Sequence, residues 1–244
     1  MNASSARAEK IRENYQQVLG EVERAVSAAG RPPDSVRVVA VTKYVGVPEA
    51  LALVEAGCLD LGESRPQSLW DKAPRLPATV RWHLIGHLQR NKVERTLPLV
   101  HLMHSLDSMR LTDAIAGEAG RIDAPIAVLL EVHIAQDSSK TGMRPEEARA
   151  WLERYTSDAL LRQRIELRGL MGMSSLDADA SQVHHEFASL RTQMEKWNEE
   201  LGLQMTELSM GMSQDFAIAI AEGSTIVRIG SRLFEGLPQA DTPR

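Results

Sequence analysis

Eight short apolar runs alternate with helical stretches along most of this chain of 244 residues. Valine, isoleucine and leucine dominate the runs, a composition that is typical of strands buried in parallel sheets. Strands that alternate with helices imply a parallel sheet, and eight such units at this length favour a (β/α)8 barrel over an open doubly wound sheet. The expected strands are Val36–Thr42, Cys58–Gly62, Val80–Gly86, Val100–Leu106, Pro125–His133, Ile165–Met173, Met205–Met210 and Thr225–Ile229.

Helical patterns fill the segments between these runs. The clearest lies in 183–201, where apolar residues recur at steps of four and three. Others are expected at 48–57, 64–72, 88–97, 109–119, 145–155 and 214–221, and one precedes the first strand at 11–29. Since no Gly/Ser-rich linker divides the chain, we predict an α/β fold: a single (β/α)8 TIM barrel with an extra N-terminal helix, forming one domain over residues 1–244.

Composition excludes several classes of protein. The net charge is -5 and no long basic run is present, which argues against nucleic acid as a partner. No apolar segment approaches the length of a membrane span, and the N-terminus lacks the apolar core of a signal peptide. The single cysteine, Cys58, allows no intramolecular disulfide. We therefore expect a cytoplasmic protein without a membrane partner.

Lys43 ends the first apolar run, VRVVAVTK. Strand alternation places Val39, Val41 and Lys43 on one face. A lysine that continues an apolar face either extends to water or loses its charge and becomes a nucleophilic amine. Taken alone, a solvated lysine at a loop edge is the favoured interpretation.

The loops that follow the seventh and eighth strands change that balance. In (β/α)8 barrels functional residues gather at the C-terminal ends of the strands, and these two loops often hold phosphate groups. Ser213 could cap the next helix or donate to an anion, and Gly230 and Ser231 could offer backbone N–H groups. Each alone favours a plain cap or turn, but their joint placement beside Lys43 favours a phosphate site.

Arg228 lies within the apolar eighth strand, on the same face as Ile226 and Gly230. An arginine in so apolar a strand needs a partner. One interpretation is a buried salt bridge to Glu131 or Glu63. The other is a fixed cation that faces a ring nitrogen or an anion of a bound ligand, and the residues alone leave both open.

The remaining polar residues indicate no metal centre and no familiar catalytic set. The histidines lack metal-ligand spacing, and no Ser-His-Asp set, GxSxG elbow, Walker loop or GxGxxG motif is present. His83 is interpreted as a hydrogen-bonded core imidazole, and 140–143 as either a ligand loop or a solvated turn. A lysine amine with a phosphate cradle is the minimum for a Schiff-base pocket around a phosphorylated aldehyde, so pyridoxal 5'-phosphate (PLP) is the candidate cofactor.

Long specific segments carry a family resemblance. They are AVTK at 40–43, GE at 62–63, WHLIGHLQRNK at 82–92, HSLDS at 104–108, SSKTGM at 138–143, RGLMGM at 168–173 and LSMGMSQDFAIAIAEGSTIVRIGSRLF at 208–234. On these segments the chain resembles the pyridoxal-phosphate homeostasis protein family, the proline synthetase co-transcribed homologues. The resemblance implies a barrel like the N-terminal domain of alanine racemase, with PLP as an internal aldimine on Lys43. It also implies that Ser213, Gly230 and Ser231 hold the phosphate and that Arg228 faces the pyridine nitrogen.

The function implied by the resemblance is vitamin B6 (PLP) homeostasis: the cofactor is held and delivered, with no accepted catalytic turnover, no catalytic residue and no metal. A fixed cation at Arg228 would keep the pyridine nitrogen unprotonated and weaken the ring as an electron sink. Cofactor-free PLP-dependent enzymes are the candidate recipients, and a monomer is expected. The chain departs from the family at Gly62-Glu63-Ser64-Arg65-Pro66, where relatives usually have Gly-Glu-Asn-Tyr, so Ser64 and Arg65 receive no binding role.

A PLP enzyme, for example an amino-acid racemase, is the main alternative. Racemases of this barrel type add a C-terminal β domain and a catalytic tyrosine, whereas this chain stops about ten residues after Phe234. Its three tyrosines are Tyr15, Tyr44 and Tyr155, and alternation should point Tyr44 away from Lys43. Two-base chemistry then lacks its second base, which favours the carrier. A Schiff-base aldolase acting on a sugar phosphate shares the barrel and the lysine, but it usually needs a deeper lysine with acid–base carboxylates nearby.

Overall fold

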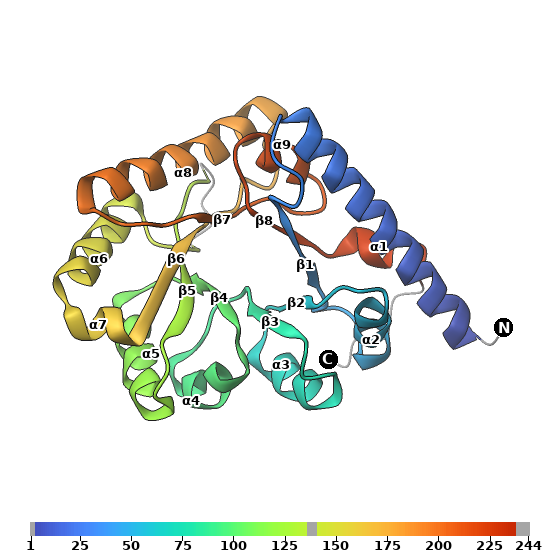
Figure 1. The fold of residues 1–244 in the computed structure, drawn as a ribbon, viewed down its shortest axis with the longest axis horizontal. Coiled ribbons are helices and arrows are strands. Elements are labelled where there is room, and N and C mark those ends of the chain that lie inside the picture. Colours follow the sequence, from blue (N-terminus) through green and yellow to red (C-terminus); the bar gives the residue numbers. More distant parts are fainter. Residues whose placement is uncertain (1–2, 136–140, 238–244) are drawn as a thin grey trace.

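The computed structural model describes residues 3–135 and 141–237, and over these residues eight parallel strands close into a barrel in chain order (Figure 1). The closure joins β1 to β8, with Val39 opposite Arg228. This confirms the predicted barrel. The strands are β1 Arg37–Val41, β2 Asp60–Glu63, β3 Arg81–Leu84, β4 Leu102–Leu106, β5 Ile126–Glu131, β6 Ile165–Met171, β7 Glu207–Ser209 and β8 Ile226–Ile229.

Helices surround the barrel in the described part of the chain (Figure 1). They are α1 Ala3–Ala28, α2 Val47–Glu55, α3 Pro66–Lys72, α4 Val93–Thr96, α5 Met109–Ile122, α6 Pro145–Ser157, α7 Ala159–Arg164, α8 Ala180–Leu201 and α9 Phe216–Ala221. The extra helix α1 packs against α2, α9 and a 3-10 helix, Ser231–Phe234, that follows β8. Asn14 of α1 donates to the carbonyl oxygens of Leu233 (3.2 Å) and Glu235 (3.0 Å), and thereby fixes the segment after β8. None of the described helices is long and apolar enough to cross a membrane.

Two helical predictions need correction. The helix expected at 88–97 is broken into α4 and two flanking 3-10 turns, Arg90–Lys92 and Leu97–Leu99. Pro98 has no N–H to continue the ladder, and the Thr96 hydroxyl donates to the Lys92 carbonyl (2.5 Å) in competition with it. The short helix α7 was not expected. Its first turn is capped by Asp158, whose carboxylate accepts from the Leu161 N–H (3.0 Å).

The barrel interior holds both apolar and polar side chains. An apolar cluster fills part of it, formed by Val39, Leu102, Ala127, Leu129, Met171 and Ile226. Alternate residues of the same strands face outward and pack against the surrounding helices. His83, His104, Ser209 and Arg228 are also buried, although each carries a polar group. Polar groups in such a position require internal partners, and those partners define the candidate site.

Candidate functional site at the C-terminal ends of the strands

A pocket of about 960 Å³ opens at the C-terminal ends of the strands. The structure brings together in its wall the five residues predicted to bind the cofactor: Lys43, Ser213, Arg228, Gly230 and Ser231. Its volume lies within the range of about 300–1,000 Å³ that is usual for small-molecule sites. Apolar side chains complete the wall, among them Val41, Ile85, Met173, Ile218 and Phe234.

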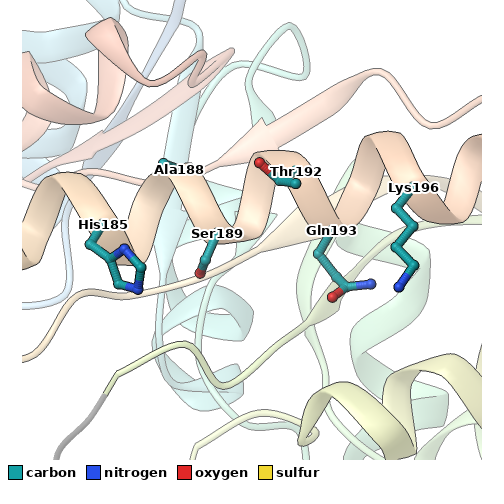
Figure 2. A pocket seen from close by; sticks show the side chains of 6 residues that line it. All are labelled: His185, Ala188, Ser189, Thr192, Gln193 and Lys196. Atoms are coloured by element: carbon teal, nitrogen blue, oxygen red, sulfur yellow. The ribbon is translucent and has the colours of Figure 1, made fainter.

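A second, smaller pocket of about 410 Å³ lies along the outer face of α8. Figure 2 shows the six residues that line it, all from successive turns of this one helix: His185, Ala188, Ser189, Thr192, Gln193 and Lys196. No strand end contributes to it, and most of its side chains are exposed. It is therefore a depression in a solvated helix surface, and the larger pocket is the candidate site.

Lys43 lies in a turn just beyond β1, with an exposed side chain. Its Nζ is 4.9 Å from the centroid of the Tyr44 ring, and both residues line the pocket. The expectation that Tyr44 points away from Lys43 is therefore wrong. Regular strand geometry ends at Val41, so the alternation rule no longer applies two residues later.

A buried ion pair holds the backbone immediately before Lys43. Glu63 accepts hydrogen bonds from the Thr42 hydroxyl (2.6 Å) and from Lys72 Nζ (2.5 Å). Lys72 also donates to the Thr42 carbonyl oxygen (2.7 Å). Sequence reasoning missed Lys72, although its place three residues after the buried Leu69, on the inner face of α3, was a usable signal.

Arg228 is almost fully buried where β8 ends, with its guanidinium at the pocket wall. Its Nη1 donates to the carbonyl oxygen (2.7 Å) and the hydroxyl (2.6 Å) of Ser209, and its Nη2 to the Gly172 carbonyl (3.1 Å). The salt-bridge interpretation named Glu131 or Glu63, but these described partners are Ser209 and Gly172, and Glu63 is paired with Lys72. Burial lowers the pKa of Arg228 to about 10, while the negative charges of Glu131 and Asp215 oppose that change. Arg228 thus remains a cation at neutral pH.

A hydrogen bond from the Gly230 N–H to the Ser213 hydroxyl (3.3 Å) joins the loops after β7 and β8. Of the two roles considered for Ser213, capping of the next helix is not observed, because α9 begins at Phe216 and Asp215 occupies the N-cap position. Asp215 instead accepts from the Met212 N–H and the Ser174 hydroxyl, both at 2.6 Å. The Ser213 hydroxyl is therefore part of the pocket wall and takes no part in helix capping.

The charges around the pocket favour an anionic ligand. Arg7, Lys43 and Arg228 contribute positive charge, and Asp215 is the one carboxylate among the described residues that line the pocket. Arg7 is paired with Glu49 (2.8 Å), and both Asp215 oxygens accept hydrogen bonds within the protein. The excess of cations therefore lies toward Lys43 and Arg228.

Other polar residues singled out in the sequence lie elsewhere. His83 is a buried, hydrogen-bonded core imidazole, as predicted. His87 pairs with Asp107 (2.5 Å). Lys140 falls outside the described residues, whereas Met143 donates to the Glu131 carbonyl (2.8 Å) beside β5. The described residues contain no group of three or more side chains suited to bind a metal ion.

Comparison with known proteins identifies the family. The sequence pattern of the alanine racemase N-terminal domain matches residues 9–238. The pyridoxal phosphate homeostasis protein of Deinococcus radiodurans is 39% identical over 218 residues, which cover 89% of this chain and 97% of that protein. This chain belongs to the pyridoxal phosphate homeostasis protein family. The homeostasis protein of Aquifex aeolicus is 33% identical, over 91% of this chain and 96% of that protein.

Solved structures of similar proteins share the fold. An unknown protein from Bifidobacterium adolescentis is 34% identical, with a TM-score of 0.87 over 96% of this chain and 97% of its own. PipY of Synechococcus elongatus, solved with PLP bound, is 32% identical, with a TM-score of 0.76 over 87% of this chain and 99% of its own. Alanine racemase of Clostridium difficile is only 16% identical, with a TM-score of 0.70 over 91% of this chain and 60% of its own, and shows the barrel fold alone. The resemblance seen in the sequence is thereby confirmed.

Proposed function

We propose that this protein binds PLP in the pocket at the C-terminal ends of the strands and holds it, attached to Lys43, for vitamin B6 homeostasis. The observation that carries the proposal is the convergence of Lys43, Arg228, Ser213, Gly230 and Ser231 on one pocket. The names of its relatives and the PLP bound to PipY support it. Cofactor-free PLP-dependent enzymes are the recipients we propose.

The residues present fit this cofactor. PLP supplies an aldehyde that reacts with a primary amine, together with a phosphate and a pyridine nitrogen. Lys43 offers its amine at the open side of the pocket, and the hydroxyls of Ser213 and Ser231 lie with the Gly230 backbone where two loops meet. Arg228 lies in the wall as a fixed, buried donor. We assign the amine role to Lys43, phosphate binding to the two serines and Gly230, and the ring nitrogen to Arg228.

The departure from the family pattern after β2 alters the same pocket. Ser64 lines it, whereas Arg65 is exposed and Pro66 is buried at the first position of α3. Gly86 allows this arrangement, because a Cβ at that position would lie 2.4 Å from the Ser64 carbonyl oxygen. A serine replaces a larger asparagine at the wall, so we propose that Ser64 widens the pocket and contributes a hydroxyl to it.

Equilibrium binding of PLP tests the proposal. Lys43→Ala should weaken binding by at least about tenfold, because it removes the covalent link that the amine provides. Lys196→Ala is the matched control: it removes an exposed lysine on α8 outside the pocket, and it should bind PLP like the wild type. Equal affinity in the wild type and Lys43→Ala would contradict the role of Lys43.

One observation favours the enzyme alternative, namely the position of Tyr44 beside Lys43. A tyrosine within reach of the same ligand could act as a second base. We nevertheless propose a carrier without turnover, since the Tyr44 side chain is 73% exposed at the mouth, and general bases usually work where water is excluded. Racemisation of alanine by the PLP-loaded protein decides the question: turnover that is lost in both Lys43→Ala and Tyr44→Phe would overturn the carrier proposal.

A further inference from the structure

A row of buried polar side chains crosses the barrel interior from the pocket to the opposite mouth. It consists of five residues from five different strands: Arg228, Ser209, His104, His83 and Asp60. Arg228 Nη1 donates to Ser209 Oγ (2.6 Å), and Ser209 Oγ lies 2.8 Å from His104 Nδ1. His104 Nε2 lies 2.8 Å from His83 Nδ1, and His83 Nε2 lies 2.9 Å from Asp60 Oδ1. The step from Ser209 to His104 joins β7 to β4 directly across the barrel.

The far end of the row is anchored at the N-terminal ends of β2 and β3. Arg81 stands opposite Asp60 in the register of these strands and donates to both of its oxygens, at 2.8 and 2.5 Å. Asp60 is buried, while the Arg81 side chain is 44% exposed. The row therefore connects a solvated arginine at one mouth with the buried Arg228 at the other.

The protonation of the row is fixed by its two ends. A guanidinium can only donate hydrogen bonds, and a carboxylate can only accept them. Burial lowers the pKa of both His83 and His104, so both rings are neutral at pH 7. Burial raises the pKa of Asp60, but hydrogen bonds from Arg81 and His83 outweigh it and bring the pKa well below its usual range. Asp60 is therefore an acceptor.

Only one arrangement of protons then satisfies every bond. His83 must carry its proton on Nε2 to donate to Asp60, which leaves its Nδ1 as an acceptor. His104 must consequently carry its proton on Nε2, and its Nδ1 accepts from the Ser209 hydroxyl. The Ser209 hydroxyl thus directs its hydrogen away from Arg228 and presents a lone pair to the guanidinium.

From this geometry we infer that Ser209, His104, His83 and Asp60 are positioning residues for the cofactor, forming a one-way hydrogen-bond chain that orients Arg228. The inference rests on the proposed function in one respect, the assignment of Arg228 to the ring nitrogen. Ser209 takes both hydrogens of Nη1, and the Gly172 carbonyl takes one from Nη2. These described acceptors engage three of the five N–H groups, and the orientation that results decides where the others point.

Measuring the tautomers of His83 and His104 in the cofactor-free protein tests whether the one-way hydrogen-bond chain exists. Nitrogen-15 NMR should show His83 and His104 as neutral rings protonated on Nε2 at pH 7. Asp60→Asn should give a mixture of tautomers at His83, because an amide can donate as well as accept. Arg81→Lys is its control, since it keeps both the Asp60 carboxylate and a cation beside it and should leave both tautomers unchanged. An Nδ1–H tautomer or a charged ring in the wild type would overturn the inference.

Binding of PLP tests the positioning role. Ser209→Ala should weaken binding by about tenfold, the usual effect of losing a buried hydrogen bond to a charged group, and should shift the absorbance of the bound cofactor. Ser105→Ala is the control. It removes a neighbouring buried hydroxyl that donates to the Gly86 carbonyl (2.7 Å) and takes no part in the hydrogen-bond chain. Asp60→Asn should also weaken PLP binding, by a smaller factor, although Asp60 lies far from the pocket.

Wild-type affinity and an unshifted spectrum in both Ser209→Ala and Asp60→Asn would overturn the positioning role. Failure of the wild type to bind PLP would instead refute the proposed function. The tautomers of the cofactor-free protein would then still decide whether the one-way chain exists.

Discussion

Replacing Lys72 by methionine should strongly destabilise the protein. Glu63 is fully buried, and its Oε1 atom accepts from Lys72 and Thr42, while its Oε2 atom has no hydrogen-bond partner among the described residues. Lys72 is the only residue in the described structure that forms an ion pair with Glu63, and Lys72→Met removes its positive charge. Removal of one partner of a buried ion pair usually costs about 3–5 kcal/mol, because it leaves an uncompensated charge.

A second substitution separates the charge from the packing. The double variant Lys72→Met/Glu63→Leu removes both charges, and a buried pair replaced by apolar side chains is often as stable as the original. The Thr42 carbonyl still loses its donor and the buried Thr42 hydroxyl loses its acceptor, at about 1 kcal/mol each. We therefore expect the double variant to be more stable than the single variant and to recover part of the free energy of unfolding that the single variant loses.

Urea unfolding followed by circular dichroism measures both effects. Lys196→Met, an exposed replacement on α8, serves as the control and should change the free energy of unfolding by less than about 0.5 kcal/mol. The reasoning is refuted by a loss under about 1 kcal/mol in Lys72→Met, or by a double variant that is less stable than the single one.

Two further predictions concern the same end of the barrel. Burial and the negative charge of Asp107 raise the pKa of Glu131 from 4.5 to about 7, although Arg228 and His87 oppose the shift. The Glu131 carboxyl therefore stays protonated to a higher pH in the folded protein than in the unfolded chain. The group therefore lowers stability as pH rises from 4.5 to 7, and Glu131→Gln should raise the free energy of unfolding at pH 8 by up to about 3 kcal/mol relative to its effect at pH 4; equal effects at both pH values in urea titrations would contradict this. Gly211→Ala should destabilise the protein by more than about 2 kcal/mol and weaken PLP binding, because Gly211 has a φ of +92° and the new Cβ would lie 2.5 Å from the Ala219 Cβ. Gly117→Ala, which meets open space within α5, should instead add about 0.5–1 kcal/mol by thermal denaturation, and the same loss in both variants would refute the steric argument.

The fold could be predicted because local patterns carry it. Most strands lie in runs that are rich in valine, isoleucine or leucine, and the long helices have apolar stripes, so the alternation was visible without tertiary information. The prediction failed where local patterns compete, as at Pro98, or where an element is too short to show a period, as in α7. A cap remained one of two interpretations of Ser213 because a serine shortly before an apolar run matches the capping pattern, whereas a turn at 213–215 separates it from α9, which begins at Phe216.

The sequence indicated the residues that line the candidate pocket, but not the residues that hydrogen-bond to them and hold them in place. Lys43 and the loops after β7 and β8 are marked by breaks in apolar runs, which a sequence displays directly. The partners of Arg228 depend on contacts between distant strands: Ser209 and His104 are 105 positions apart, and no local period links them. Tyr44 was placed on the wrong side because the position at which strand geometry ends is decided by the turn at Lys43.

Borohydride reduction of the PLP-loaded protein, followed by peptide mass mapping, tests the central claim most directly. The account predicts a phosphopyridoxyl adduct on the peptide that contains Lys43, because this lysine alone among the described pocket-lining residues offers a primary amine. Lys43→Ala should give no adduct under the same conditions. An unmodified wild-type protein, or an adduct confined to another lysine such as Lys72, would contradict the claim that this pocket holds the cofactor through Lys43.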